Sequence, residues 1–201
     1  VIIASGAKRK KLGCPGEKDF LGKGVSYCAT CDGGFFKNKT AVVVGGGNTA
    51  LEDALYLSTI CQKVYIIHRR DTFKAEKVLV DSVQKNSKIE VIYNCAVKEI
   101  QGSSSVELIK ANLLIEKKLI DIKANAIFIS IGTEPDIDFV KDIIETDKNG
   151  YIIAPEDCTC SIKGICVAGD CRTKPLRQIV TATSDGAIAA FQAINYIKQM
   201  K

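Results

Sequence analysis

Two cysteines separated by two residues and followed by an acid form the most chemically informative pattern in this sequence. Cys28 and Cys31 enclose Ala29-Thr30, and Asp32 follows directly. A pair with this spacing can be half of a zinc site, a thiol–disulfide redox centre or a coincidence in a cysteine-rich chain. A zinc site would need a second such pair or two nearby histidines, whereas the chain has one histidine, His68, and no second pair. We therefore expect a redox dithiol, with Asp32 as its proton donor.

A glycine-rich segment follows the dithiol and lies between a predicted strand and a predicted helix. Residues 41–44 form an apolar run typical of a strand buried on both faces of a parallel sheet, and residues 51–60 carry apolar side chains at helical spacing. The residues between them fit the pattern G-x-G-x-x-A and are Gly45, Gly46, Gly47, Asn48, Thr49 and Ala50. In this context the pattern predicts a dinucleotide site, with the pyrophosphate at the helix N-terminus. We expect Gly45 to form the tight turn, Gly47 to admit the pyrophosphate and Ala50 to let the helix pack closely.

The residues that follow the next predicted strand indicate which nicotinamide cofactor is used. That strand spans residues 64–67 and leads into His68, Arg69 and Arg70, with Lys74 close behind. An NAD site normally places a carboxylate here to bind the ribose 2′-hydroxyl. Two guanidinium groups at this position favour a 2′-phosphate over the alternative of a solvated loop, so we expect NADPH. His68 either contacts the adenosine or is an incidental packed or surface residue.

Composition excludes several classes of function. The formal charge of +5 is spread along the 201 residues, without the clustered basic and aromatic face of a nucleic-acid binder. No apolar run approaches the ~20 residues that span a bilayer. The nine cysteines are odd in number and only Cys28 and Cys31 are spaced as a unit, so we expect the other seven to be reduced thiols in the cytoplasm. The four cysteines between 158 and 171 match no zinc spacing, and we expect no metal site.

The chain also begins abruptly. It has no initiator Met, and residues 1–7 already have the pattern of a buried strand that enters a tight turn. The features of a signal peptide are missing. We infer a fragment, or the ordered part, of a longer polypeptide. Polar segments at 8–24 and 134–136 then predict domain boundaries, which divide the chain into residues 1–11, 12–133 and 134–201.

The remaining apolar patterns predict further elements. In chain order they are a helix at 75–85, a strand at 89–93, an antiparallel β-rich insertion at 95–124, buried strands at 126–131, 151–153 and 164–168, and a long helix at 176–200. The strand before that helix ends in Gly169-Asp170, which is either an ordinary connection or a means of placing a carboxylate on a polyol. Phe35 and Phe36, after the dithiol, are either core or lid residues or hold a partner protein.

With these motifs in place, the sequence resembles the low-molecular-weight thioredoxin reductases of the bacterial type from Val1 to its end. The motifs that carry the resemblance are Gly24-Val25-Ser26, Cys28-Ala29-Thr30-Cys31-Asp32-Gly33, Gly45 to Ala50, His68-Arg69-Arg70-Asp71, Ala168-Gly169-Asp170 and Arg177-Gln178. The resemblance implies a fold of two dinucleotide-binding domains, in which an NADPH domain (12–133) is inserted into an FAD domain (1–11 and 134–201). It also implies a homodimer when the protein is complete.

The same resemblance implies roles for individual residues. Cys31 lies against the flavin, Cys28 exchanges with thioredoxin and Asp32 handles the proton. Gly169 and Asp170 belong to the flavin site, where Asp170 bonds the ribityl chain, and Arg177 and Gln178 lie near the flavin ring.

Three departures from the family pattern stand out. Lys74 replaces an arginine that family members often carry, and a lysine acts as a point charge where arginine offers a fork. Gly34 displaces an aromatic residue that usually follows the Asp-Gly pair, which affects how thioredoxin would dock. The N-terminal segment with a second glycine motif, which binds the ADP half of FAD, is not in this sequence.

The sequence thus predicts an α/β protein with a Rossmann-like, three-layer nucleotide-binding domain and an incomplete second, flavin-binding domain. Its predicted function is NADPH-dependent reduction of thioredoxin through FAD and the dithiol. Two alternatives stay open: the flavoprotein reductase of a peroxide-reducing system, and an NADPH-binding module that never holds flavin.

Overall fold

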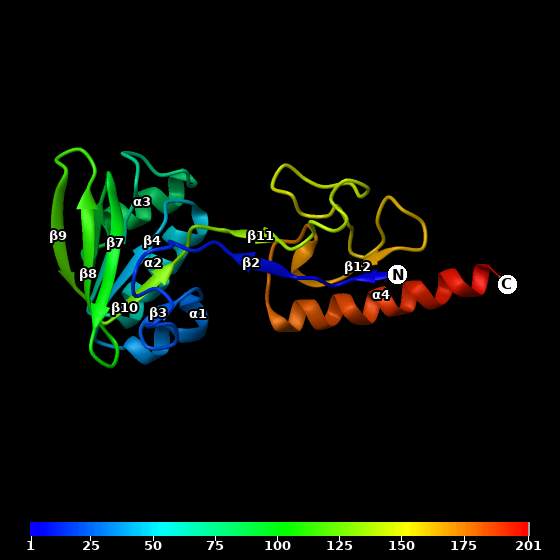
Figure 1. Cartoon of the computed structure of the whole chain (residues 1–201), viewed down its shortest axis with the longest axis horizontal. Helices are drawn as coiled ribbons and strands as arrows, with labels where there is room; N and C mark the ends of the chain where they lie inside the picture. The colour runs from blue at the N-terminus through cyan, green and yellow to red at the C-terminus, as the bar shows by residue number, and fades with distance from the viewer. Residues whose placement is uncertain (201) are drawn as a thin grey trace. The chain divides into compact units, whose positions relative to one another are not determined.

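The computed structural model describes residues 1–200 and divides them into two compact units (Figure 1). One unit contains Val1–Lys10 and Thr133–Lys201, and the other contains Lys11–Gly132. These boundaries fall one residue before each of the predicted ones. Each unit has its own hydrophobic core. None of the helices in the described part of the chain is long and apolar enough to cross a membrane.

The unit Lys11–Gly132 is built on a five-stranded parallel sheet in the order β3-β10-β4-β5-β6. Its strands are β3 (Val25–Ser26), β4 (Thr40–Val44), β5 (Lys63–Ile67), β6 (Ile89–Ile92) and β10 (Ala126–Ile129). The pairing of β4 with β5 places Val44 opposite Ile67. Because both strands end there, the glycine turn after β4 and the basic residues after β5 leave the sheet at the same edge. This edge is where dinucleotides bind in open α/β sheets.

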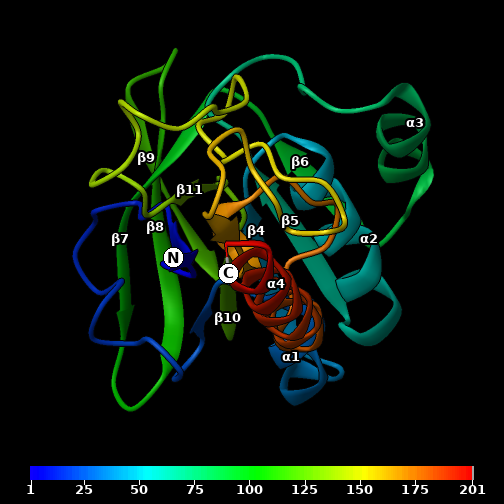
Figure 2. The same ribbon diagram turned by 90° about the vertical axis from the view of Figure 1, so that its right-hand side faces the viewer.

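Helices cover one face of this sheet (Figure 2). They are α1 (Ala29–Asp32), α2 (Asn48–Ile60) and α3 (Lys77–Lys85), and the short 3₁₀ helix η1 (Gly33–Phe36) follows α1. Leu51, Ala54 and Leu57 of α2 are fully buried and pack against apolar residues of the strands. The spacing of these three residues follows the helical period, which is why the sequence predicts α2 well.

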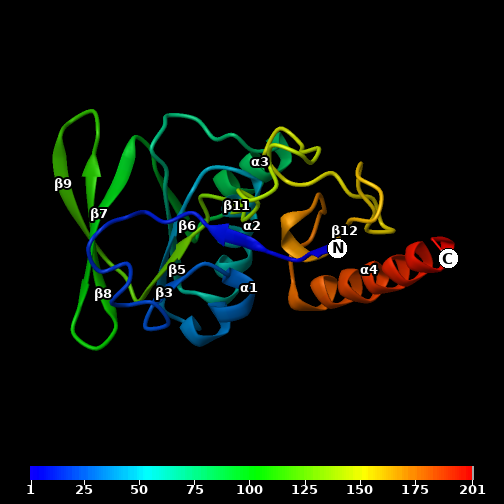
Figure 3. The same cartoon turned by 45° about the vertical axis from the view of Figure 1, so that its right-hand side comes forward.

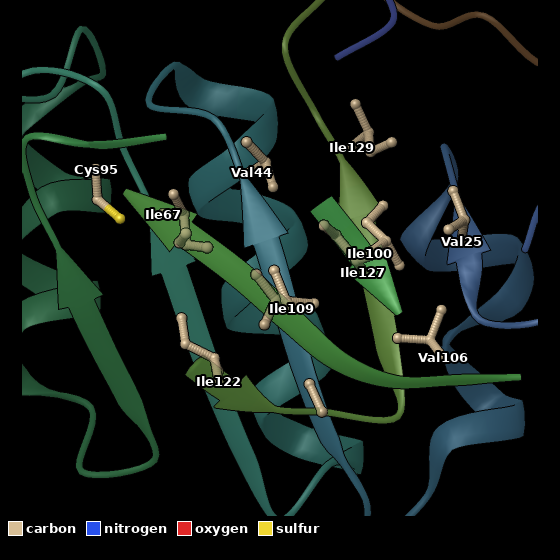
Figure 4. Packing of buried hydrophobic residues seen from close by; sticks show 13 residues of the cluster. Val25, Val44, Ile67, Cys95, Ile100, Val106, Ile109, Ile122, Ile127 and Ile129 are labelled. Atoms are coloured by element: carbon tan, nitrogen blue, oxygen red, sulfur yellow. The ribbon is translucent and has the colours of Figure 1, made fainter. Parts of the chain in front are cut away.

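A three-stranded antiparallel sheet covers the other face and confirms the predicted insertion. It consists of β7 (Cys95–Gly102), β8 (Val106–Leu113) and β9 (Lys118–Lys123). Figure 4 shows Ile100, Val106 and Ile109 of this sheet against Val44 and Ile127 of the parallel sheet. Helices, parallel sheet and antiparallel sheet form three layers, as the predicted Rossmann-like fold requires.

The unit of Val1–Lys10 and Thr133–Lys201 has little regular structure apart from one long helix (Figure 3). β1 (Ile2–Ile3) pairs in parallel with β12 (Cys166–Val167), and a 3₁₀ turn, η2 (Gly169–Cys171), follows β12. The helix α4 (Ile179–Gln199) contacts β1, β12 and η2. The core of this unit is made mainly of isoleucines and Val167; the isoleucines are Ile3, Ile137, Ile144 and Ile152.

Several elements differ from the sequence-based expectations. β2 (Ala7–Arg9) pairs antiparallel with β11 (Thr133–Pro135), where the sequence predicted polar connections. Both strands are short and carry no alternation of apolar residues, so no pattern marks them. The strand expected at 151–153 is reduced to isolated bridges that Ile152 makes with Thr146 and Arg172.

The helix α4 confirms the predicted helix but buries a different face. Asp185 and Ala189 are its buried residues. The apolar face that the sequence predicts is turned to solvent in this chain, with Ile179 87% and Phe191 63% exposed. The apolar pattern therefore predicts the helix correctly but does not show which of its faces packs within this chain.

Candidate functional site

The predicted dithiol lies where β3 leaves the parallel sheet. Cys28 and Cys31 are joined by a disulfide across the first turn of α1. The backbone N–H of Cys31 donates to Cys28 Sγ at 3.2 Å, and Thr30 Oγ1 lies 3.4 Å from the same sulfur. Hydrogen bonds of this kind stabilise a thiolate, so Cys28 is suited to act as a nucleophile once the disulfide is reduced.

Asp32, the predicted proton donor, is hydrogen-bonded by a serine. The Ser26 hydroxyl donates to Asp32 Oδ2 at 2.6 Å and accepts a hydrogen bond from the Cys28 N–H at 3.0 Å. The sequence predicts Asp32 as a proton donor but indicates no role for Ser26, which appears only in the motif Gly24-Val25-Ser26. A signal was available, because a serine that precedes a turn commonly bonds backbone groups two residues on.

The residue between Ser26 and the disulfide ties the dithiol to the segment that enters this unit. The Tyr27 hydroxyl donates to Glu17 at 2.7 Å, and Glu17 also accepts from the backbone N–H groups of Leu12 and Gly13. Burial and the Glu17 carboxylate together raise the pKa of Tyr27 well above its ordinary value. The polar segment that was predicted as a plain connection is therefore fixed to the chain beside Cys28.

The two phenylalanines after the dithiol have separate roles. Phe36 packs edge-on against Phe128, with ring centroids 5.8 Å apart, and belongs to the core under the helices. Phe35 is 77% exposed. The structure therefore resolves the predicted pair into one core residue and one surface residue.

The glycine turn has the geometry that a pyrophosphate needs. Gly45 has a φ of +153°, and a side chain there would collide with the carbonyl oxygen of Ser130 and with Ala50. At Gly47 the nearest atom to an added Cβ would be the Lys74 carbonyl oxygen at 3.8 Å, so the backbone faces open space. Gly47 is also the N-cap of α2, whose first N–H groups no described side chain caps. Free N–H groups at a helix N-terminus are a ready site for phosphate.

The structure shows why position 46 must be a glycine, which the motif alone does not explain. A Cβ at this position would strike the imidazole ring of His68. His68 is buried, its Nε2 donates to the Thr72 carbonyl at 2.9 Å, and its ring lies 5.4 Å from that of Phe73. Burial lowers the pKa of His68, and the nearby arginines contribute in the same direction. The structure thus packs His68 against the glycine turn, and contact with the adenosine stays a prediction.

The basic loop after β5 is attached to the glycine turn through its backbone and through one side-chain pair. Lys74 N–H donates to the Gly46 carbonyl at 2.7 Å. Asn48 Nδ2 donates to Glu76 Oε1, and Glu76 N–H donates back to Asn48 Oδ1, both at 2.9 Å. The residues 74–76 are used in these contacts, which explains why α3 begins at Lys77, two residues later than predicted.

The cationic side chains of this loop are available to a ligand. Arg69, Arg70 and Lys74 are exposed, and none of them forms an ion pair within residues 1–200. Thr49 is likewise exposed in the first turn of α2. The structure thus brings the predicted nucleotide residues to one edge of the sheet, although the Asn48 side chain is engaged by Glu76.

The second predicted site lies in the other unit, at the turn after β12. Asp170 Oδ1 is buried and has no hydrogen-bond partner among the described residues. A buried carboxylate oxygen without a partner is unfavourable, and such exceptions usually mark a missing water, ion or ligand. A hydroxyl of a polyol chain would satisfy it, so the residue fits the predicted ribityl contact.

A buried ionic cluster that the sequence did not reveal fixes this turn to α4. Arg172 binds Asp185 through two nitrogens at 2.9 and 2.8 Å, and Lys174 Nζ binds the same carboxylate at 2.6 Å. Gly169 N–H also donates to Asp185, at 2.9 Å. Burial alone would raise the pKa of Asp185, but these bonds outweigh it and hold the pKa well below its usual range.

Arg177 and Gln178 lie between this turn and the start of α4. The Arg177 guanidinium lies 3.9 Å above the Tyr151 ring, and its Nε is 3.4 Å from the Asp170 carbonyl oxygen. Gln178 is the N-cap of α4. The structure therefore places the Arg177 side chain against the Asp170 backbone, with Gln178 next in the chain, and the roles of these residues at a flavin stay a prediction.

The dithiol, the glycine turn and the three-layer sheet thus lie together in the unit Lys11–Gly132. The chain belongs to the pyridine nucleotide-disulphide oxidoreductase family, whose model matches residues 1–186.

Proteins named thioredoxin reductase are its relatives within that family. The chain is 42% identical over 201 residues to the one from Treponema pallidum, and the match covers 100% of this chain and 65% of the relative. It is 44% identical over 204 residues to the one from Peptoclostridium acidaminophilum, across 98% of this chain and 65% of the relative. The crystal structure of thioredoxin reductase from Streptococcus pyogenes matches with a TM-score of 0.91 and 43% identity, across 99% of this chain and 65% of that one. The resemblance and the fold class predicted from the motifs are thus confirmed, and the chain spans about 65% of the length of these relatives.

Proposed function

We propose that this chain is the NADPH-binding and dithiol part, with a portion of the flavin-binding part, of a reductase that passes electrons from NADPH through FAD to thioredoxin. The observation that carries the proposal is the Cys28–Cys31 disulfide, which is flanked by Asp32 in the same unit as the dinucleotide turn. The names of the relatives support thioredoxin as the substrate. In this proposal Lys11–Gly132 is the NADPH domain, and the other unit belongs to the FAD domain.

The residues present fit both cofactors. Gly47 and the N-terminus of α2 would hold the pyrophosphate of NADPH, while Arg69 and Arg70 would hold its 2′-phosphate. Asp170, with its unpartnered oxygen, would accept a hydrogen bond from the ribityl chain of FAD. A bound flavin would supply the electron transfer between NADPH and the disulfide. The unpartnered Asp170 argues against the alternative of a module that never holds flavin.

The chain's own residues perform the thiol step. Cys28 attacks the substrate disulfide as a thiolate, which the hydrogen bonds from Cys31 N–H and Thr30 support. Asp32 carries the proton that the departing thiolate takes up. Seven free cysteines are compatible with a reducing cytoplasm, where we place the protein. The family resemblance further suggests a homodimer.

The proposal is tested by measuring the rate at which the intact protein, purified from its cells, reduces thioredoxin with NADPH. Cys28→Ser and Cys31→Ser should each abolish thioredoxin reduction while flavin bleaching by NADPH continues, because the two steps use different groups. A serine variant that reduces thioredoxin at the unaltered rate would falsify the proposed mechanism. Replacing thioredoxin with a peroxiredoxin tests the alternative, since efficient reduction of the peroxiredoxin alone would favour a peroxide-reducing system.

A further inference from the structure

Ser26 occupies a position between the sheet and both chemical groups of the thiol site. It is 5% exposed, and its backbone is held in β3 by pairing with Phe128 of β10. Its Oγ lies 2.6 Å from Asp32 Oδ2, 3.0 Å from the Cys28 nitrogen and 3.4 Å from the Cys28 carbonyl oxygen. One hydroxyl thus joins the proton donor to the backbone of the attacking cysteine.

The single proton of this hydroxyl can serve either form of the carboxyl group. When Asp32 is ionised, the short distance to Oδ2 shows that Ser26 donates to it. When Asp32 is protonated, its O–H can donate to Ser26 Oγ, and the serine O–H can turn to the Cys28 carbonyl. Asp32 therefore keeps a partner in the same place before and after it gives up a proton.

We propose that Ser26 is a positioning residue for thiol–disulfide exchange and that it acts through Asp32. Its role is to hold the Asp32 carboxyl beside Cys28 in both protonation states, so that the departing thiolate receives a proton without a rearrangement of the loop. The inference deepens the proposed function and rests on it. Ser26 contacts neither sulfur through any hydrogen bond of the described residues, so its effect is indirect.

The exchange balances with Asp32 as the carrier of both protons. The Cys28 thiolate attacks the substrate disulfide, a mixed disulfide forms, and the departing sulfur takes the proton of Asp32. Cys31 then gives its proton to the Asp32 carboxylate and attacks Cys28 Sγ, and the second substrate sulfur leaves and takes that proton. The Cys28–Cys31 disulfide forms again, and the substrate has gained two electrons and two protons.

The choice of disulfide substrate separates this role from a purely structural one. Glutathione disulfide releases a basic thiolate whose departure benefits from a proton, whereas the aromatic disulfide DTNB releases an acidic thiol that leaves unaided. Loss of a positioning group for Asp32 should slow the first reaction and spare the second. General distortion of the loop should slow both.

The test uses the 201-residue chain, reduced with dithiothreitol and freed of it, at neutral pH. The rates of reaction with glutathione disulfide and with DTNB are measured for the unaltered chain, Ser26→Ala, Ser26→Thr, Asp32→Asn and the Ser26→Ala/Asp32→Asn double variant. A Cys28→Ser/Cys31→Ser variant gives the background from the seven other thiols. Ser58→Ala is the matched control, because Ser58 is also 5% exposed and its hydroxyl donates to the Leu55 carbonyl, in a helix of the same unit.

We expect Ser26→Ala to reduce glutathione disulfide about 10- to 100-fold more slowly and DTNB within about twofold of the unaltered rate. Ser26→Thr, which keeps the hydroxyl, should restore most of the rate, and Ser58→Ala should change neither. In the Asp32→Asn background, Ser26→Ala should add little, because its effect passes through Asp32.

Three results would overturn the inference: an unaltered rate for Ser26→Ala with glutathione disulfide, an equal loss with both disulfides, or losses from Ser26→Ala and Asp32→Asn that multiply independently. A different result would overturn the proposed function itself. If the Cys28→Ser/Cys31→Ser variant reacted as fast as the unaltered chain, the dithiol would not be the reactive centre.

Discussion

At the scale of single residues, the proposed preference for NADPH depends on two exposed arginines. Arg69 and Arg70 follow β5 at the edge where the glycine turn lies, and neither has an ion pair in the described part of the chain. Charge-assisted hydrogen bonds contribute roughly 1.5–3 kcal/mol each. Two such bonds to a 2′-phosphate are enough to decide between NADPH and NADH.

We predict that the unaltered chain binds NADPH more tightly than NADH by on the order of 10²–10⁴-fold. Arg69→Ala/Arg70→Ala should remove most of this preference and leave NADH binding nearly unchanged, as measured by titration with each nucleotide. Lys118→Ala/Lys123→Ala, which removes the same charge from exposed positions of β9, is the control. A preference that survives the arginine substitutions would exclude these residues as the basis of selectivity.

His68 gives a second prediction at this scale. Burial lowers its pKa below the ordinary 6.5, so the folded state prefers the neutral ring and the unfolded state binds more protons near that pH. Its contribution to stability is therefore complete above about pH 7.5 and declines as the pH falls through about 6.5. The thermal midpoint should fall over that interval in the unaltered chain.

Because His68 is the single histidine, the assignment can be tested cleanly. His68→Gln should lower stability at pH 7.5 but flatten the dependence of the thermal midpoint on pH between about 7.5 and 5.5. The same slope in both proteins would mean that another group titrates there.

At the scale of elements, the sequence predicted the helices and strands that have a regular apolar pattern. It missed features that depend on individual polar contacts. Helix α2 and the parallel strands β4, β5, β6 and β10 were predicted because apolar residues repeat at helical spacing or in continuous runs, whereas the two-residue strand β3 carries no such pattern. The late start of α3 was not predicted, because it depends on the hydrogen bonds between Asn48 and Glu76. The buried cluster around Asp185 was missed for the same reason, since Arg172 and Lys174 lie 13 and 11 residues before Asp185 and no periodic pattern links them.

The attachment of the basic loop to the glycine turn can be tested through Glu76. Glu76→Ala removes the acceptor for Asn48 Nδ2 without touching the arginines. We expect NADPH binding to weaken by about 3- to 10-fold and the preference over NADH to shrink, because the loop loses its fixed place beside the turn. Asn86→Ala is the control, since it removes the hydrogen bonds to Ser58 and Lys88 at the other end of α3. An unchanged affinity in Glu76→Ala would show that the backbone contacts suffice.

At the scale of the whole molecule, the two nucleotide sites are unequal. The proposed NADPH unit has its strand, glycine turn, helix and basic loop within Lys11–Gly132. The other unit has Asp170, Arg177 and Gln178, but the sequence offers no second glycine turn to hold the pyrophosphate of FAD. The proposed ribityl contact alone would leave out the binding energy that a pyrophosphate site supplies.

We therefore predict that the 201-residue chain alone binds NADPH and does not retain FAD. The measurements are the visible absorbance of the purified chain and separate titrations with NADPH and FAD. Stoichiometric yellow flavin carried through purification would contradict the prediction, and so would tight FAD binding by the chain alone.

The exposed face of α4 has a consequence for how this chain behaves at boundaries between phases. Ile179, Val180, Phe191, Ile194 and Ile197 recur at intervals that place them along one side of the helix, and each is more than half exposed. An amphipathic helix with an exposed apolar face adsorbs to air–water surfaces and to plastic. Dilute solutions of the chain should therefore lose protein to tube walls, and a trace of mild nonionic surfactant should recover it.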